Sequence, residues 1–241
     1  MRFHAIVSYD GSNYYGFQSQ KNALGIQEVI EKALKNMTQQ VIKIHSSGRT
    51  DKGVHAIAQS FHFDCALNIP VENFADALNR RLPDDIRIIK VVKVSKLFHA
   101  RHSAISKKYV YKLSKKPITA FNAHHLVYIP KLNYTLMREA SKAFIGTFNF
   151  AGFAAKVPGK PTIKTIFDVS IHETSTSFYI EFHGNSFLKY MVRSMVGTLI
   201  EIGQGKKTKN DIIKNLQTPD RKLAGKTAPG KGLYLKKVYY K

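Results

Sequence analysis

The chain has 241 residues, 44% of them hydrophobic, with 38 lysines and arginines against 16 aspartates and glutamates and a formal net charge of +22. This length and apolar content indicate a globular protein of one large domain or two ordinary ones. So large a positive charge is expected on a protein that binds nucleic acid or an anionic membrane surface.

The compartment is indicated by what the sequence lacks. Cys65 is the only cysteine, so no internal disulfide can form, which fits a reducing compartment. No apolar run approaches the roughly 18 to 20 residues that cross a bilayer. Met1–Asp10 alternates like a strand and lacks the apolar run of a signal peptide. We therefore expect a cytoplasmic protein with no membrane partner.

The positive charge is concentrated in the second half of the chain. Residues 1–100 carry a net charge of +4, whereas residues 101–241 carry +18. A lysine-rich surface can be merely a solvated face. An imbalance of this size nevertheless favours a surface that binds a polyanion, and nucleic acid is the first partner to test.

The first half alternates between strand and helix patterns. Arg2–Tyr9 has apolar residues at every second position and runs into a polar turn, which is typical of a strand entering a loop. From Gly25 to Met37 the apolar residues follow helical spacing. The next predicted elements are, in order, strand Val41–His45, strand Gln59–Cys65, helix Glu72–Arg81 and strand Ile86–Val94.

The second half repeats this irregular alternation. Phe187–Ile202 is the longest apolar helix pattern and is predicted to be a core helix that stops at Gly203. The other predicted elements are strand Lys108–Leu113, helix Tyr134–Phe144, and strands Ile163–Glu173, Phe178–His183 and Leu233–Tyr240. We expect an α+β protein of two similar halves, residues 1–104 and 105–241, with mainly antiparallel sheets flanked by helices around a central cleft.

A glycine-bounded turn within Ser47–Ala56 places Asp51 between Arg49 and Lys52. Beside these cations the carboxylate is expected to stay ionised, with a pKa below the usual value of about 3.9. It could then act as a covalent nucleophile. The alternative is a structural turn in which Asp51 and Arg49 form a surface ion pair, and the turn alone does not distinguish the two.

Three further residues could carry chemistry. Tyr109 and Tyr111 share one face of a strand and are framed by lysines, which suits aromatic stacking on bases and cationic contacts to phosphates; a pair of core residues is the alternative. A tyrosine hydroxyl beside a carboxylate could also relay a proton. Arg193 lies within the apolar core-helix pattern and needs an anionic partner, for which Asp51, another carboxylate or a phosphate would serve.

A metal site is not indicated. His62 and Cys65 are three residues apart, but no second cysteine and no suitably spaced glutamate accompany them, as a zinc deaminase would need. Asp84 and Asp85 are the only adjacent acids, and neighbouring side chains point apart, which disfavours a two-metal nuclease. The histidines are expected to have structural roles.

Several separated motifs together resemble the TruA family of pseudouridine synthases, and the likeness runs nearly end to end. Tyr9–Gln18 is similar to the family's Y-D-G-x-x-Y-x-G-W-Q, and Gly48–Ala56 to its G-R-T-D-x-G-V-H-A. Further similarities are those of Phe98–Ala104 to F-x-A-R-F-S-A, Lys108–Tyr111 to K/R-Y-x-Y, Gly184–Gly197 to G-N-x-F-L-x-x-M-V-R-x-x-x-G, and Ala228–Leu233 to A-P-x-x-G-L.

The resemblance implies the pseudouridine synthase fold and a reaction without metal or organic cofactor. Asp51 is expected to attack the target uridine at the ribose C1′, after which the freed uracil turns and rejoins through C5. Arg49 would hold the flipped nucleotide. Tyr109 would stack on the uracil and assist removal of the C5 proton, and Arg193 would hold Asp51 in place.

The same motifs imply contacts to the RNA substrate outside the chemical step. The residues expected to make them are Tyr14, Gln18, His55, Arg101, Lys108, Asn185 and Phe187.

The family further implies a homodimer that modifies uridines 38 to 40 in the anticodon arm of tRNA. Three residues depart from the family pattern, with Phe17 in place of Trp, His102 in place of Phe and Lys164 in place of Arg. These departures leave the choice of substrate open. The alternatives are the same chemistry on ribosomal RNA, and a non-catalytic RNA-binding or chaperone protein.

Overall fold

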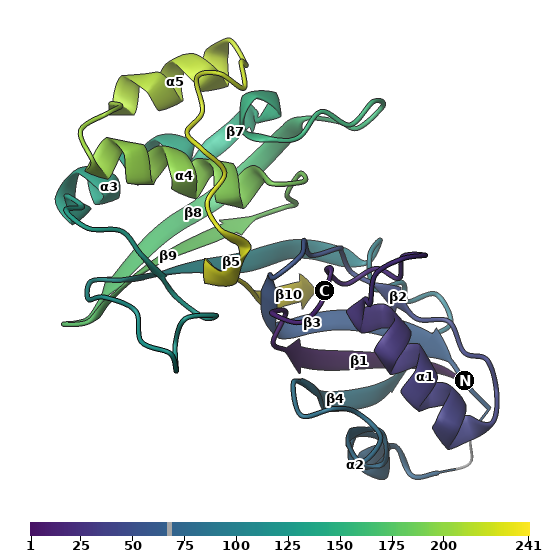
Figure 1. Ribbon diagram of the computed structural model, residues 1–241. Coiled ribbons are helices and arrows are strands. Elements are labelled where there is room, and N and C mark those ends of the chain that lie inside the picture. The colour runs from purple at the N-terminus through teal and green to yellow at the C-terminus, as the bar shows by residue number, and fades with distance from the viewer. Residues whose placement is uncertain (67–68) are drawn as a thin grey trace. The chain divides into compact units, whose positions relative to one another are not determined.

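The computed structural model describes residues 1–66 and 69–241, and the chain divides into two compact units (Figure 1). The N-terminal unit is Met1–Ile105 together with Tyr234–Lys241, and the C-terminal unit is Ser106–Leu233. The division lies one residue later than the predicted one, between 105 and 106. It also differs in the final segment, which returns to the N-terminal unit because strand β10 pairs there.

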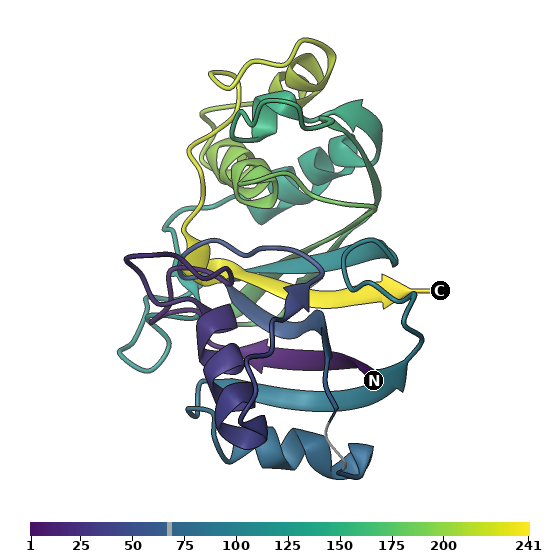
Figure 2. The ribbon, with the colours of Figure 1, turned by 90° about the vertical axis from the view of Figure 1, so that its right-hand side faces the viewer.

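The N-terminal unit is built on a sheet with the strand order β4-β1-β3-β10, to which β2 adds beside β3. Its strands are β1 (Arg2–Tyr9), β2 (His45–Ser46), β3 (His55–Asp64), β4 (Ile86–Val94) and β10 (Leu233–Tyr240). All pairs are antiparallel except β10 with β3, where Tyr234 lies opposite His55 in a parallel register. Figure 2 shows the yellow β10 beside the blue strands of this unit.

Strict alternation along β1 explains how this sheet buries one face. Every second residue from Phe3 to Tyr9 is buried, as expected when side chains alternate across a strand. Helix α1 (Ile26–Thr38) contacts α2 (Phe74–Asn79), which follows a 3-10 turn over Val71–Asn73. The Phe74 ring lies 5.2 Å from that of Phe3, so α2 covers this apolar face of the sheet.

The C-terminal unit has its own antiparallel sheet, with the order β5-β9-β8-β7. The strands are β5 (Ala104–Ser114), β7 (Gly146–Asn149), β8 (Ile163–Glu173) and β9 (Ser177–Gly184), and the short β6 (Val127–Tyr128) pairs in parallel with the end of β5. The helices are α3 (Tyr134–Ser141), α4 (Met191–Gly203) and α5 (Lys209–Gln217), with 3-10 turns at Lys142–Phe144, Ala151–Phe153 and Gly230–Gly232. The predicted α+β class, with mainly antiparallel sheets flanked by helices, is confirmed.

Helix α4 is the core helix of the C-terminal unit, as predicted, but it begins four residues later. Its side chains are buried almost all round, which a helix packed on several sides requires. Phe187 lies in the preceding loop, where the Asn185 side chain accepts hydrogen bonds from the backbone of Thr165 and Ser186. Tyr190 then takes a left-handed backbone, with φ 65°, and so cannot be part of the helix.

Other helices and strands begin or end at residues different from those predicted. The strand predicted over Val41–His45 is reduced to β2, and the helices predicted over Glu72–Arg81 and Tyr134–Phe144 each contain a 3-10 turn, before α2 and after α3 respectively. Strands β6 and β7 and helix α5 were not predicted. Among the described residues, no helix is both long enough and apolar enough to cross a membrane.

Candidate active site

The Asp51 loop joins β2 to β3 and is held at its start by a buried polar network. The Ser47 backbone N–H donates to the Ser60 carbonyl at 2.8 Å, and the Ser47 hydroxyl donates to Gln59 Oε1 at 2.8 Å. The Gln59 amide nitrogen in turn donates to the Gly48 carbonyl at 2.9 Å. Ser47 and Gln59 are both buried. One glutamine side chain on β3 thus fixes where the loop leaves the sheet.

Thr50 anchors the middle of the loop. Its side chain is buried and shares a 2.8 Å hydrogen bond with the Tyr9 hydroxyl, and its carbonyl accepts from the Phe17 backbone at 3.2 Å. Arg49 and Lys52, on either side, are exposed, and Asp51 is half-buried. The inward threonine therefore leaves the two cations at the surface beside the carboxylate, where they attract polyanions.

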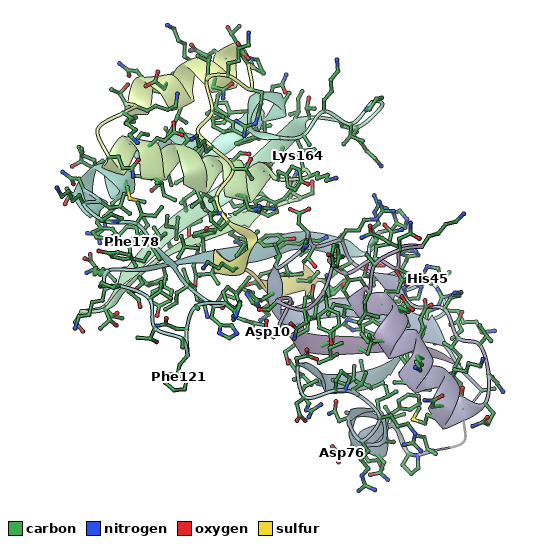
Figure 3. The ribbon with its side chains drawn as sticks, viewed as in Figure 1. Asp10, His45, Asp76, Phe121, Lys164 and Phe178 are labelled. Atoms are coloured by element: carbon green, nitrogen blue, oxygen red, sulfur yellow. The ribbon has the colours of Figure 1, made fainter. Side chains whose placement is uncertain are left out.

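A second loop, Asp10–Gln18, follows β1 and packs closely on the Asp51 loop; Figure 3 labels Asp10 at its start. A Cβ added at Gly16, whose φ is +99°, would lie 2.4 Å from the Thr50 carbonyl oxygen. A Cβ at Gly11 would lie 2.1 Å from the Val54 carbonyl oxygen. Only glycine permits so close an approach of two backbones, so both glycines allow the second loop to pack on the Asp51 loop.

Tyr14 anchors this second loop to the core of the N-terminal unit. Its ring is buried, and its hydroxyl donates to Asp85 Oδ1 at 2.7 Å. Burial, assisted by Asp85, raises the pKa of Tyr14 well above its ordinary value, so the hydroxyl stays protonated and remains a donor. The structure thus gives Tyr14 a supporting role beneath the loop, whereas Gln18, at the end of the same loop, is exposed.

His55 lies beneath the two loops. It is 1% exposed, and its ring stacks on that of Tyr234 at a centroid distance of 4.5 Å. Its Nδ1 is 3.1 Å from the Gly11 backbone nitrogen and 3.0 Å from Asp10 Oδ1. Nδ1 accepts from Gly11 when it is unprotonated and donates to Asp10 when it is protonated, so the two bonds are alternatives. In either state His55 joins the loop to β3.

Tyr109 and Tyr111 have different surroundings on β5. The Tyr111 ring is fully buried, its hydroxyl donates to the Pro229 carbonyl at 2.9 Å, and a Cβ at Gly232 would lie 2.6 Å from the ring. Tyr111 is therefore a core residue, and burial raises its pKa. Tyr109 is 9% exposed and packs edge-on against Phe187, with ring centroids 5.0 Å apart.

Arg193 occupies the first turn of α4 and is bound to the segment that precedes β10. Its Nε donates to the Ala228 carbonyl at 2.7 Å, while the Ala228 backbone N–H donates to the Arg193 carbonyl at 3.0 Å. The Arg193 guanidinium carbon also lies 5.2 Å from the centroid of the Tyr190 ring. The arginine is half-buried, and its side chain contacts the Ala228 carbonyl and the Tyr190 ring.

The remaining predicted substrate contacts fall in both units. Lys108 Nζ lies 3.9 Å from Glu181, a buried carboxylate on β9, while Arg101 is exposed in the N-terminal unit. Asn185 holds the loop that carries Phe187. The structure therefore places Arg49, Asp51, Tyr14, Gln18 and His55 on or next to the two packed loops of the N-terminal unit. It brings Tyr109 together with Phe187 in the C-terminal unit.

Three supporting features were missed in the sequence. Gln59 and the Tyr9–Thr50 pair act between segments far apart in the chain, and a single sequence gives no signal for such pairings. The close approaches at Gly11 and Gly16 had a signal, because two glycines flank a tyrosine-rich loop that follows a strand directly.

Comparisons with known proteins agree with the resemblance seen in the sequence motifs. A family model described as tRNA pseudouridine synthase matches residues 5–103 and 140–241. The protein named tRNA pseudouridine synthase A from Onion yellows phytoplasma is 43% identical over 238 residues, covering 99% of this chain and 98% of that protein. The protein of the same name from Oceanobacillus iheyensis is 43% identical, covering 99% and 96%.

The protein named tRNA pseudouridine synthase A from Staphylococcus aureus is 40% identical and covers 99% of this chain and 91% of that protein. A solved structure titled as a Cbf5-Nop10-Gar1 complex aligns with 96% of this chain and 57% of the matched chain, at 10% identity and a TM-score of 0.38. That structural likeness is too low to support an argument. The family model and the relatives suffice: the chain belongs to the family of tRNA pseudouridine synthases, enzymes that isomerise uridine in tRNA.

Proposed function

We propose that this chain converts uridine to pseudouridine in the anticodon stem-loop of tRNA, with Asp51 as the nucleophile. The observation that carries the proposal is the way Asp51 is held. Thr50 is fixed by Tyr9 on one side of it, Gly16 permits the close approach of the second loop, and the cations Arg49 and Lys52 flank it at the surface. A fixed carboxylate beside cations suits attack on a polyanionic substrate.

The proposed reaction balances without a cofactor. An Asp51 carboxylate oxygen bonds to the ribose C1′ as the bond from C1′ to N1 breaks, and that electron pair leaves on the uracil. The uracil turns, its C5 bonds to C1′, and the Asp51 carboxylate leaves. The proton on C5 passes to a base and N1 takes up a proton, so the product is an isomer of the substrate.

The other site residues would assist this step. Arg49 would hold the nucleotide out of its stack, and Tyr109 would stack on the uracil and assist removal of the C5 proton. Arg193 would pair with the Asp51 carboxylate. The contacts that support these roles are the packing of Tyr109 on Phe187 and the bond from Arg193 to Ala228.

Membership of the family supports a proposal for the substrate and for the assembly. We propose uridines 38 to 40 of tRNA as targets, a homodimer as the active form and the cytoplasm as the compartment. The net charge of +18 on residues 101–241 supports binding of the RNA backbone. Tyr14, Gln18, His55, Arg101, Lys108, Asn185 and Phe187 remain the residues proposed to bind or to support binding of the substrate.

Release of tritium from 5-tritiated uridine in tRNA tests the chemistry. The Asp51→Asn variant should lose at least about a thousandfold in rate, as expected when a nucleophile is removed, and should still bind tRNA. Asp84→Asn is the matched control, because Asp84 is fully exposed and its loss changes the charge equally. Full activity of Asp51→Asn would overturn its assignment, and wild-type protein that binds tRNA without releasing tritium would favour a non-catalytic role.

Mapping of pseudouridine in RNA from cells that lack the gene tests the substrate. Loss at tRNA positions 38 to 40 is the expected result. Loss confined to ribosomal RNA would retain the chemistry and overturn the proposed substrate.

A further inference from the structure

Tyr190 has an unusual backbone for its residue type. It is one of three non-glycine residues with positive φ among those described, the others being Gln39 and Lys131. Gln39 caps the end of α1, where a left-handed residue is common. Tyr190, in contrast, stands at the start of α4, where the capping residue is usually extended. A left-handed backbone is costly for tyrosine and persists only where the surrounding structure stabilises it.

The left-handed backbone sets the Tyr190 ring beside Arg193. The guanidinium carbon lies 5.2 Å from the ring centroid, within the range of a cation–π contact. The Tyr190 carbonyl still accepts the first hydrogen bond of α4, from the Ser194 backbone at 2.9 Å. Lys189 Nζ also lies near the ring, at 5.1 Å. The helix therefore begins normally while its capping residue contacts the arginine one turn later.

The hydrogen bond from Arg193 Nε to the Ala228 carbonyl also has a fixed position. Ala228, whose carbonyl accepts from Nε, belongs to a segment that lies close against α4. A Cβ at Gly197 would lie 1.7 Å from the Lys226 carbonyl oxygen, and the Gly225 backbone N–H donates to the Thr198 hydroxyl at 2.8 Å. The Ala228 carbonyl is thus set rigidly relative to the helix. Because the guanidinium is planar, fixing its Nε edge and one face also fixes the direction of its two Nη groups.

We propose that Tyr190 is a positioning residue for Arg193. Its ring fixes the plane of the guanidinium, so that the directions of the Nη groups are set before they pair with a carboxylate. This rests on the proposed function, in which that carboxylate is Asp51. The position 190 lies between the motif residues Leu188 and Met191 and no role is assigned to it by the motif itself.

The test removes the ring but keeps the backbone conformation. Tyr190→Asn is suitable because asparagine tolerates the left-handed region better than most residues, and Tyr190→Phe keeps an aromatic ring. We expect Tyr190→Asn to lower kcat about fivefold to tenfold, the effect of losing one cation–π contact, with KM for tRNA changed less than twofold. Tyr190→Phe should keep kcat within twofold. Gln39→Asn, at an exposed left-handed position occupied by a neutral residue, is the matched control and should leave kcat unchanged.

A readout independent of activity separates this inference from the proposed function. The Arg193 Nε–H can be followed by NMR of protein with ¹⁵N-labelled arginine, and its signal is identified by its loss in Arg193→Lys. Its exchange with water should be slow in the wild type and in Tyr190→Phe, and at least several times faster in Tyr190→Asn. Equal exchange in all three, or equal loss of kcat in the Phe and Asn variants, would overturn the proposal. Changed exchange together with an active Asp51→Asn variant would instead overturn the proposed function.

Discussion

The Lys52 ammonium lies 3.8 Å from the centroid of the Tyr15 ring, and this contact joins the two loops that form the nucleophile site. In the sequence, Lys52 has no role beyond that of a cation beside Asp51. The backbone contact from the Gly53 N–H to the Tyr14 carbonyl, at 3.3 Å, lies directly beside it. Lys52 therefore joins the loops from the solvent side, while Thr50 does so from the buried side.

We predict that Lys52 and Tyr15 are energetically coupled. Both side chains are exposed, so their coupling free energy should be small, about 0.5 to 1 kcal/mol. Urea unfolding of Lys52→Ala, Tyr15→Ala and the double variant measures it. Tyr15→Phe should retain the coupling, because the ring supplies it. Strictly additive losses in the cycle would show that the contact contributes nothing.

The two positive-φ glycines of the site should respond very differently to alanine. Gly16→Ala would drive a methyl group into the Thr50 carbonyl, so it should cost more than about 2 kcal/mol of stability and reduce activity strongly. Gly53 also has a positive φ, +70°, but a Cβ there meets nothing within 4 Å. Gly53→Ala should cost only about 1 kcal/mol of backbone strain. Thermal unfolding and single-turnover rates measure both, and similar losses in the two variants would contradict the close approach.

Much of the fold could be predicted because strand alternation and helical spacing are properties of neighbouring residues in the sequence. The alternation of Phe3, Ala5 and Val7 was enough to predict β1, and the helical spacing after Gly25 was enough to predict α1. The return of β10 to β3 was not predicted, because a strand's own pattern does not specify its partner. Helix α5 was missed because it is mostly polar, although its capping box at Thr208 and Asp211 was a readable signal.

The residues of the candidate site could be predicted from the sequence, but the contacts that hold them in place could not. Asp51, Tyr109 and Arg193 were identified from their motifs. Their supports, among them Gln59 and the Ala228 carbonyl, are contacts between distant segments. The start of the core helix was placed too early because an apolar period does not reveal that Tyr190 is left-handed.

Gly197 should be essential for the close packing of α4 on residues 225–228. A Cβ at Gly197 would lie 1.7 Å from the Lys226 carbonyl oxygen, so Gly197→Ala must separate the helix from the segment that binds Arg193. We expect a loss of about 2 to 3 kcal/mol in stability and a fall in activity. Gly203→Ala is the matched control on the same helix, because its Cβ would meet flexible side chains, chiefly Met137. It should change stability by less than about 1 kcal/mol. A thermal shift as large for Gly203→Ala as for Gly197→Ala would contradict this prediction.

Stability of the N-terminal unit should fall in mild acid because of His62. Its ring lies 5.0 Å from that of His45 and 4.5 Å from that of His99. Burial, with the nearby charges of His99, Arg2 and His45, lowers the pKa of His62 to about 4.

Because the ordinary pKa of histidine is about 6.5, the unfolded chain takes up a proton at His62 between about pH 6.5 and pH 4 and the folded chain does not. The contribution of His62 to stability is therefore complete above about pH 6.5 and declines as the pH falls through that window. Between pH 7 and pH 5 the decline should be about 1 to 2 kcal/mol. Burial also lowers the pKa of His99 and His4, which acts in the same direction.

The variant His62→Asn isolates this effect, because the Asn oxygen can replace Nδ1 as the acceptor for the Ala100 backbone N–H. Its stability should depend less on pH than that of the wild type over the same range, whatever its stability at pH 7. Urea unfolding at pH 7, 6 and 5 measures the two slopes, and ¹H NMR titration of the His62 ring gives its pKa directly. A titration midpoint near 6.5, or parallel slopes for the two proteins, would show that the buried imidazole does not resist protonation.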